Sequence, residues 1–127
     1  MTDASKAGRR SRNKGKAGEL ELAHFLTDRG FPAERAQQFK GGQHSEDIHA
    51  PALRALGLHI ECKRVERPMF GEWLEKAFAE CVGTDKEPLI CWRKSKGGWI
   101  AVLPLEKLLA LLPQPIPPEM RALLYGE

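Results

Sequence analysis

The sequence has few of the features that mark membrane-spanning, secreted or zinc-binding proteins. Its apolar runs fall well short of the roughly 20 residues that a membrane helix requires, and its first residues are polar and basic. We therefore expect no membrane span, no secretory signal and a cytoplasmic protein. Three widely separated cysteines suit neither a disulfide framework nor a CxxC zinc site, so we expect reduced and mostly buried thiols at Cys62, Cys81 and Cys91.

The composition is that of one globular domain with an uneven charge. The 127 residues are 42% hydrophobic and 29% charged, and the net charge is +3. Residues 1–16 contain one acidic residue, Asp3. Their basic residues are Lys6, Arg9, Arg10, Arg12, Lys14 and Lys16. We predict a flexible basic arm over residues 1–12 and a single domain over 13–127. The arm suits phosphate contacts with nucleic acid, although a solvated tail that aids solubility explains the charge as well.

Hydrophobic periodicity predicts alternating helices and strands. We predict helices over residues 13–30, 70–82, 105–112 and 118–124, and strands over 31–39, 47–50, 58–65, 88–93 and 99–103. The clearest strand is 58–65, in which polar residues alternate with apolar ones. This order of elements predicts an α/β fold with a mixed β-sheet flanked by helices.

Three acids and a lysine form the most suggestive pattern. Glu19 lies at the edge of the inward stripe of the first helix, while Asp47 opens one short strand and Glu61 lies in the next. If those strands pair, the carboxylates meet at one sheet edge, and Lys63 projects from the same face as Glu61. Phosphodiester hydrolysis needs such a group, because Mg²⁺ takes one or two carboxylates and a lysine can orient the attacking water.

Each part of this pattern has an ordinary explanation when it stands alone. A Glu-x-Lys pair on a strand is usually a solvated pair of charges, Asp47 could end a turn, and Glu19 could be an exposed helix acid. Their combination in one order is what favours a site.

Several short segments of the sequence resemble those of a known protein family. In order they are Asn13 to Glu19, Gly30-Phe31, Arg35, Gly41-Gly42, Asp47-Ile48 and Ile60-Glu61-Cys62-Lys63. Together they resemble the archaeal-type Holliday junction resolvases and their phage-encoded relatives, in the PD-(D/E)XK nuclease superfamily. The resemblance implies a restriction-endonuclease-like fold, with the central mixed sheet flanked by helices.

The resemblance also implies an activity, a cofactor and an assembly. It implies a metal-dependent, structure-specific endonuclease that resolves four-way DNA junctions in recombination and repair, leaving 5′-phosphate ends. Its catalytic residues would be Glu19, Asp47, Glu61 and Lys63. Mg²⁺, with Mn²⁺ as a substitute, would bind Asp47, Glu61, the Cys62 backbone carbonyl and Glu19, the last directly or through water. The enzyme would be a homodimer in a bacterial, archaeal or phage-infected cell.

Basic residues around the predicted site are candidates for DNA contacts. They are Arg9, Arg10, Arg12, Lys14, Lys16, Arg35, Lys40, His44, Arg64 and Lys76. Two of them depart from the family pattern. Lys40 stands where related sequences often have serine, and Lys76 where many have a glutamine, which weakens the prediction of junction specificity.

Other interpretations stay open from the sequence. Another PD-(D/E)XK nuclease of the nicking, repair or restriction type would share this chemistry, whereas a non-catalytic DNA-binding module would use the acids only to tune a basic surface. No His-Asn-His arrangement is visible, and strand histidines such as His49 and His59 are commonly half-buried polar groups. We expect Leu105, Leu108, Leu109 and Leu112 in the core, with dimerisation as the minor alternative.

Overall fold

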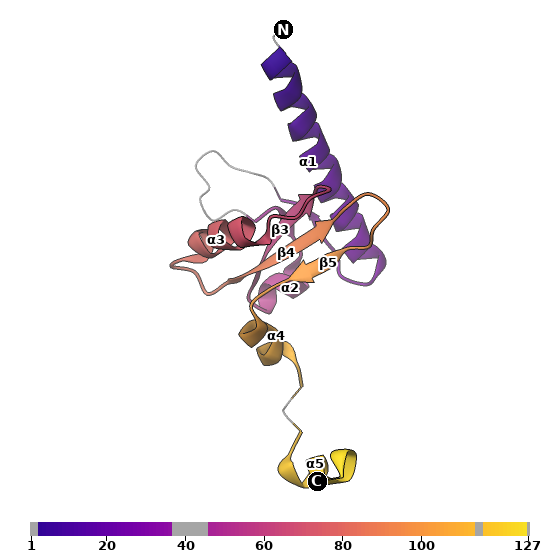
Figure 1. Cartoon of the computed structure of the whole chain (residues 1–127), viewed down its shortest axis with the longest axis vertical. Coiled ribbons are helices and arrows are strands. Elements are labelled where there is room, and N and C mark those ends of the chain that lie inside the picture. The colour runs from indigo at the N-terminus through magenta and orange to yellow at the C-terminus, as the bar shows by residue number, and fades with distance from the viewer. Residues whose placement is uncertain (1–2, 37–45, 114–115, 127) are drawn as a thin grey trace.

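The computed structural model describes residues 3–36, 46–113 and 116–126 of the chain. Helices and strands alternate along it, as Figure 1 shows. Among these residues, no helix has the length and apolar character needed to cross a membrane.

A mixed three-stranded sheet carries the fold. Its order is β3-β4-β5, in which β3 runs parallel to β4 and β5 runs antiparallel to it. The strands are β3 (Leu58–Arg64), β4 (Glu87–Arg93) and β5 (Ile100–Val102). A separate antiparallel ribbon pairs β1 (Glu34–Arg35) with β2 (Ile48–His49). The predicted α/β fold with a mixed sheet and a β4–β5 hairpin is therefore confirmed.

Two long helices flank the sheet, α1 (Asp3–Asp28) and α3 (Phe70–Cys81). The first contacts β3, and the second contacts β4 and forms the crossover between the two parallel strands. Gly18 lets α1 approach β3 closely, because a Cβ added there would lie 2.6 Å from Cβ of Arg64. This close contact brings the neighbouring residue Glu19 to the sheet.

The buried core lies between α1 and the strands. Leu22 and Ala23 of α1 pack with apolar residues of β2, β3 and β4, namely Ile48, Leu58, Ile60, Leu89 and Cys91, and with Ala50. All three cysteines are free, and Cys81 and Cys91 are buried while Cys62 is half-buried. The predicted state of the thiols is thus confirmed.

The structure differs from the predicted elements at three places. The first helix begins at Asp3 instead of Asn13, because residues 3–12 contain no proline and include good helix formers. A short helix, α2 (Pro51–Ala55), follows β2, where Pro51 occupies a first-turn position that suits proline. The predicted strand 31–39 is reduced to the two residues of β1, and its end at 37–39 lies outside the described residues.

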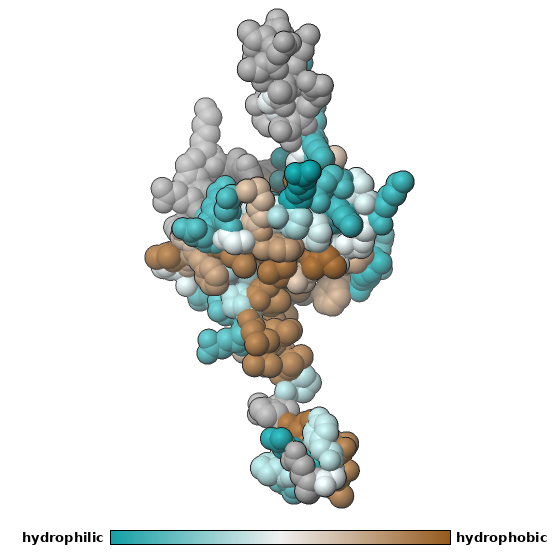
Figure 2. Space-filling model, in the orientation of Figure 1, coloured by the Kyte–Doolittle hydropathy of each residue, from teal (hydrophilic) through white to brown (hydrophobic). Residues whose placement is uncertain are grey.

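The prediction that the C-terminal leucines lie in the core is wrong. Helix α4 (Leu105–Leu111) has no buried residue, and neither has α5 (Pro118–Tyr125). The exposed leucines include Leu105 at 68% and Leu109 at 59%. The chain leaves the sheet after β5, and among the described residues that follow it Leu103 and Leu111 pack against the core. Figure 2 shows α4 as an apolar projection from the body of the molecule.

Candidate active site

Asp47 is fixed at the point where the ribbon meets the sheet. Its backbone amide donates to the Ile60 carbonyl at 2.9 Å, and its Oδ2 accepts the Cys62 amide at 2.8 Å. These two hydrogen bonds join the chain just before β2 to the edge of β3 that does not pair with β4. They take the place of regular strand pairing between β2 and β3. The expectation that Asp47 and Glu61 would meet at one sheet edge holds in this form.

The Cys62 carbonyl faces the same edge. In a β-strand the N–H and C=O of one residue leave the backbone on the same side, and the Cys62 N–H points to Asp47. Burial raises the pKa of the Cys62 thiol far above its usual value, so the sulfur stays protonated and is a poor metal ligand. The backbone oxygen is thus the donor that Cys62 offers.

Glu61 lies among other acids. Its side chain is only 12% exposed, and burial, with the neighbouring Glu80 and Asp47 carboxylates, raises its pKa to about 10. Burial acts in the same direction on Glu80, but hydrogen bonds with Glu61 and His59 outweigh it and hold the pKa of Glu80 below its usual value. In the absence of a cation, the two glutamates therefore titrate as a coupled pair that retains one proton.

His59 completes this acidic group. It is 5% exposed, and its Nε2 lies 2.9 Å from Oε1 of Glu61 and 3.3 Å from Oε2 of Glu80. Sequence reasoning expected a half-buried histidine and missed Glu80 altogether. One signal was available, since Glu80 lies three residues after Ala77 and next to Cys81, both of which are buried in α3.

Glu19 reaches the site from α1 and is held by an arginine. Nε of Arg35 donates to its Oε2 at 2.5 Å, and the Glu19 side chain is 13% exposed. Burial raises the pKa of Glu19, the Arg35 hydrogen bond lowers it, and the charge of Asp47 raises it again, with a net upward shift. Because the Asp47 charge acts on both Glu19 and Glu61, Asp47 is the centre of the three acids.

Lys63 follows Glu61 on β3 and is half-buried. Its Nζ lies 5.7 Å from the centre of the Trp73 ring, which is a cation–π distance. Trp73 also packs edge-on against Phe70. The aromatic group thus limits the positions that the ammonium can take.

Glu46, next to Asp47, has a different role. It is 5% exposed and accepts hydrogen bonds from Nη1 of Arg54 at 3.0 Å and from the Ile60 amide at 3.5 Å. These contacts tie the segment before β2 to α2 and to β3. We interpret Glu46 as a structural acid that fixes the position of Asp47.

The basic residues predicted to bind DNA occupy different surroundings. Arg9, Lys14, Lys16 and Lys76 are exposed, whereas Arg35 is engaged with Glu19. Nε of Arg64 lies 3.5 Å from Oε2 of Glu21, and its Nη1 lies 3.8 Å from Oε1 of Glu66. Lys40, His44 and the side chains of Arg10 and Arg12 lie outside the described residues. Their roles stay predictions.

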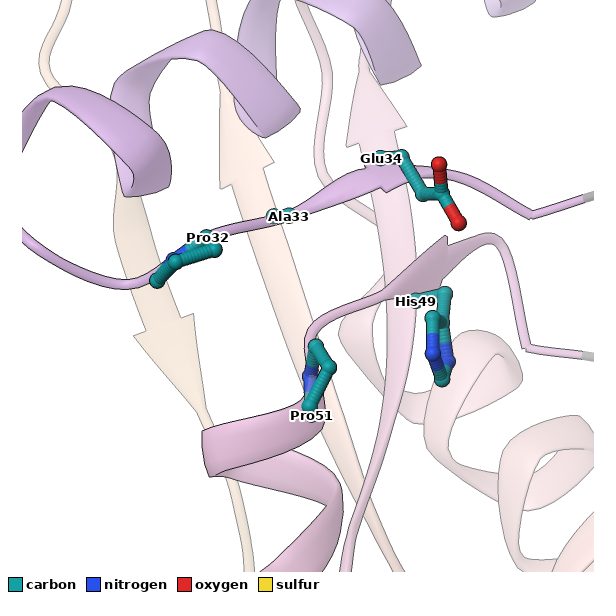
Figure 3. Close-up of a pocket in the computed structure, with 5 residues that line it drawn as sticks. All are labelled: Pro32, Ala33, Glu34, His49 and Pro51. Atoms are coloured by element: carbon teal, nitrogen blue, oxygen red, sulfur yellow. The ribbon is translucent and has the colours of Figure 1, made fainter.

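A separate pocket opens beside the β1–β2 ribbon. It is lined by Pro32, Ala33, Glu34, His49 and Pro51 (Figure 3). None of the four predicted catalytic residues lines it. This pocket is therefore distinct from the group formed by Glu19, Asp47 and Glu61.

The donors around Asp47 suit a hard divalent cation. Asp47 and Glu61 offer two carboxylates, Cys62 offers a carbonyl, and Glu19 offers a third carboxylate from the facing helix. Mg²⁺ prefers oxygen ligands and uses one or two carboxylates directly. The residues present thus fit such an ion.

Comparison with known proteins gives a family match and a structural match. No curated protein matched the chain. A solved structure of Hjc, a Holliday junction resolvase from the hyperthermophilic archaeon Archaeoglobus fulgidus, is 26% identical and superposes with a TM-score of 0.52, over 71% of this chain and 72% of that one. The sequence profile of the family described as phage putative PDDEXK endonuclease matches residues 10–123. That match spans most of the sequence, and the chain therefore belongs to this family of PD-(D/E)XK nucleases.

Proposed function

We propose that this nuclease is a Mg²⁺-dependent endodeoxyribonuclease that resolves four-way DNA junctions by paired hydrolysis of phosphodiester bonds, in recombination and repair. The observation that carries the proposal is the hydrogen bond between the Asp47 carboxylate and the Cys62 amide, because it supports a shared site for Asp47 and Glu61 at one edge of β3. The similarity to the archaeal resolvase supports the choice of a branched substrate.

Asp47, Glu61 and the Cys62 carbonyl would hold the cation, with Glu19 as a further ligand, directly or through water. PD-(D/E)XK nucleases use divalent metal ions, and Mn²⁺ is the expected substitute here. Bound at these residues, the ion would neutralise charge on the phosphoryl oxygens and lower the pKa of a bound water.

Lys63 and Arg35 have distinct roles in this proposal. Lys63, restrained by Trp73, donates a hydrogen bond to the attacking water or to the phosphate and so stabilises the developing negative charge. Arg35 donates a hydrogen bond to the Glu19 carboxylate and so opposes the rise in its pKa that burial and the charge of Asp47 cause. Water adds to phosphorus as the bond to the 3′ oxygen breaks, which leaves a 5′-phosphate end.

Substrate binding and assembly complete the proposal. The exposed basic residues Arg9, Lys14, Lys16 and Lys76 would contact phosphates on the arms of the junction. Two opposed strands must be cut, so two active sites are needed, and we propose a homodimer. The exposed leucines of α4 offer apolar surface that a second copy could cover.

The test compares DNA shapes of identical sequence. Purified protein with Mg²⁺ is incubated with an end-labelled four-way junction and with linear duplexes of the same arms, with Asp47→Asn in parallel. Asp85→Asn is the matched control, because the Asp85 side chain is 87% exposed. We expect paired symmetric cuts in the junction alone, lost in Asp47→Asn and kept in Asp85→Asn.

Other results would overturn parts of the proposal. Equal cleavage of linear duplex would favour a nicking, repair or restriction-like nuclease. Binding to the junction without cleavage would favour a non-catalytic DNA-binding module.

A further inference from the structure

The β3–α3 side of the site contains ligand atoms that the proposed Mg²⁺ site does not use. Nε2 of His59, a carboxylate oxygen of Glu61 and one of Glu80 all lie within 4.8 Å of one another. The imidazole is the common neighbour, at 2.9 Å from Glu61 and 3.3 Å from Glu80. A buried nitrogen donor thus faces two oxygen donors.

We propose that His59, Glu61 and Glu80 form a second divalent-cation site, which takes an imidazole-binding ion such as Mn²⁺ or Zn²⁺ and shares Glu61 with the site around Asp47. This inference rests on the proposed function in one respect, because Glu61 is also a proposed ligand of Mg²⁺. No other residue of that site takes part.

The spacing of the donors suits one ion. Nitrogen and oxygen ligands bind such cations at roughly 2.0–2.2 Å, so adjacent ligands of one ion lie about 3 Å apart by the same geometry. The two measured separations from His59, 2.9 and 3.3 Å, bracket this value. Binding would therefore require little movement of the side chains.

The supporting elements are rigid. His59 and Glu61 are two residues apart on β3 and so project from the same face. Glu80 comes from α3, which is fixed to β4 as the crossover between the parallel strands. The site is thus held by regular structure on both sides.

The charges around this group favour a cation. Asp47, Glu61 and Glu80 bring three carboxylates together, and each of the two glutamates is the other's hydrogen-bonding neighbour. Lys76 acts on Glu80 electrostatically, but its own side chain is exposed. Buried charges are normally paired or coordinated to a metal, and a bound cation would supply that compensation.

The imidazole also gives the site its selectivity. Imidazole nitrogen suits transition-metal ions and zinc, whereas Mg²⁺ prefers oxygen. A purely hydrogen-bonded arrangement is the alternative. In that case the proton retained by the Glu61–Glu80 pair and the His59 imidazole would connect the three side chains without a cation.

The experiment detects nitrogen coordination directly. The full-length protein, stripped of metal, is titrated with Mn²⁺ and studied by pulsed electron paramagnetic resonance, which reports ¹⁴N nuclei bound to the ion. The variants are His59→Asn, Glu80→Gln and Asp47→Asn. His49→Asn is the matched control, because His49 lies on β2 outside the cluster.

We expect a ¹⁴N signal that disappears in His59→Asn and persists in Asp47→Asn and in His49→Asn. Glu80→Gln should weaken binding of the nitrogen-coordinated Mn²⁺ by at least about 10-fold. Circular dichroism confirms folding, and Glu80→Gln provides the test if His59→Asn does not fold.

Absence of a ¹⁴N signal in the native protein, or its loss in His49→Asn but not in His59→Asn, would overturn the second site. Unchanged Mn²⁺ affinity in folded Glu80→Gln would do the same. These failures are distinct from failure of the proposed function, because the junction assay with Asp47→Asn is performed in Mg²⁺ alone.

Discussion

The glutamates on the two sides of Asp47 have different neighbours. On the α1–β1 side, Glu19 receives a hydrogen bond from the Arg35 guanidinium. On the β3–α3 side, Glu61 faces Glu80 and Asp47, and among the described residues its ion-pair contact is His59. Burial raises the pKa of both acids. The protein itself therefore compensates much of the charge of Glu19, whereas Glu61 needs a proton or a cation.

The largest effect should come from removing the carboxylate on the β3–α3 side. We expect Glu61→Gln to lower kcat by at least about 10³-fold, because it removes a direct metal ligand. Glu19→Gln should lower kcat by about 10–100-fold, as expected for a ligand that acts partly through water. Single-turnover cleavage in saturating Mg²⁺ measures both rates.

The matched control for these variants is Glu75→Gln, at an exposed position of α3. It should cut at the native rate. Equal decreases in kcat in Glu61→Gln and Glu19→Gln would contradict the proposed difference between the two sides of Asp47.

A smaller decrease in kcat should follow when the positive charge of Arg35 on the α1–β1 side is removed. Arg35→Gln leaves Glu19 without its guanidinium partner, so we expect kcat to fall by about 10–100-fold with KM for DNA little changed. Arg35→Lys should recover part of kcat, because it restores the charge but not the geometry. A rise in KM with unchanged kcat would instead identify Arg35 as a phosphate contact.

Much of this site could be predicted from the sequence, for local reasons. The strict alternation in β3 placed Glu61 and Lys63 on one face, and that periodicity depends only on the pleat of a strand. Glu19 followed from its position beside the apolar stripe of α1, which the structure buries at Leu22 and Ala23. For Asp47 the sequence predicted a position beside Glu61 if their two strands paired; in the structure β2 pairs with β1, and Asp47 contacts β3 through its own amide and carboxylate.

Other features depended on contacts between distant segments. Glu80 is 19 residues from Glu61 in the chain, and the β3–α3–β4 crossover brings them together. The pairing of Arg35 with Glu19 likewise requires β1 to lie against α1. The leucines of α4 follow a helical pattern that fits a core or an interface equally well, and the sequence could not distinguish a buried stripe from an exposed one.

The smallest effect is a pH dependence of stability that comes mainly from the β3–α3 side, because the pKa of Glu61 is raised further than that of Glu19. In metal-free protein, Glu61 has a pKa of about 10 when folded and its ordinary pKa of 4.5 when unfolded. Between these values the folded chain holds a proton that the unfolded chain has released, so the free energy of unfolding falls as the pH rises. The pKa of Glu80 is lowered, so that group affects stability only below its ordinary pKa of 4.5, outside this range. We therefore expect the Tm to fall between about pH 5 and about pH 8.5.

Thermal unfolding in EDTA measures this slope, and Glu61→Gln should flatten it because the variant has no proton to lose. Glu66→Gln is the control, since Glu66 is exposed and its pKa is lowered. Keeping the pH below about 8.5 avoids titration of the thiols in the unfolded chain. Added Mn²⁺ should flatten the slope of the native protein as well, because a cation at Glu61 replaces the proton. A slope that persists in Glu61→Gln would place the proton on another residue, and the proposed contrast with Glu19 would then fail.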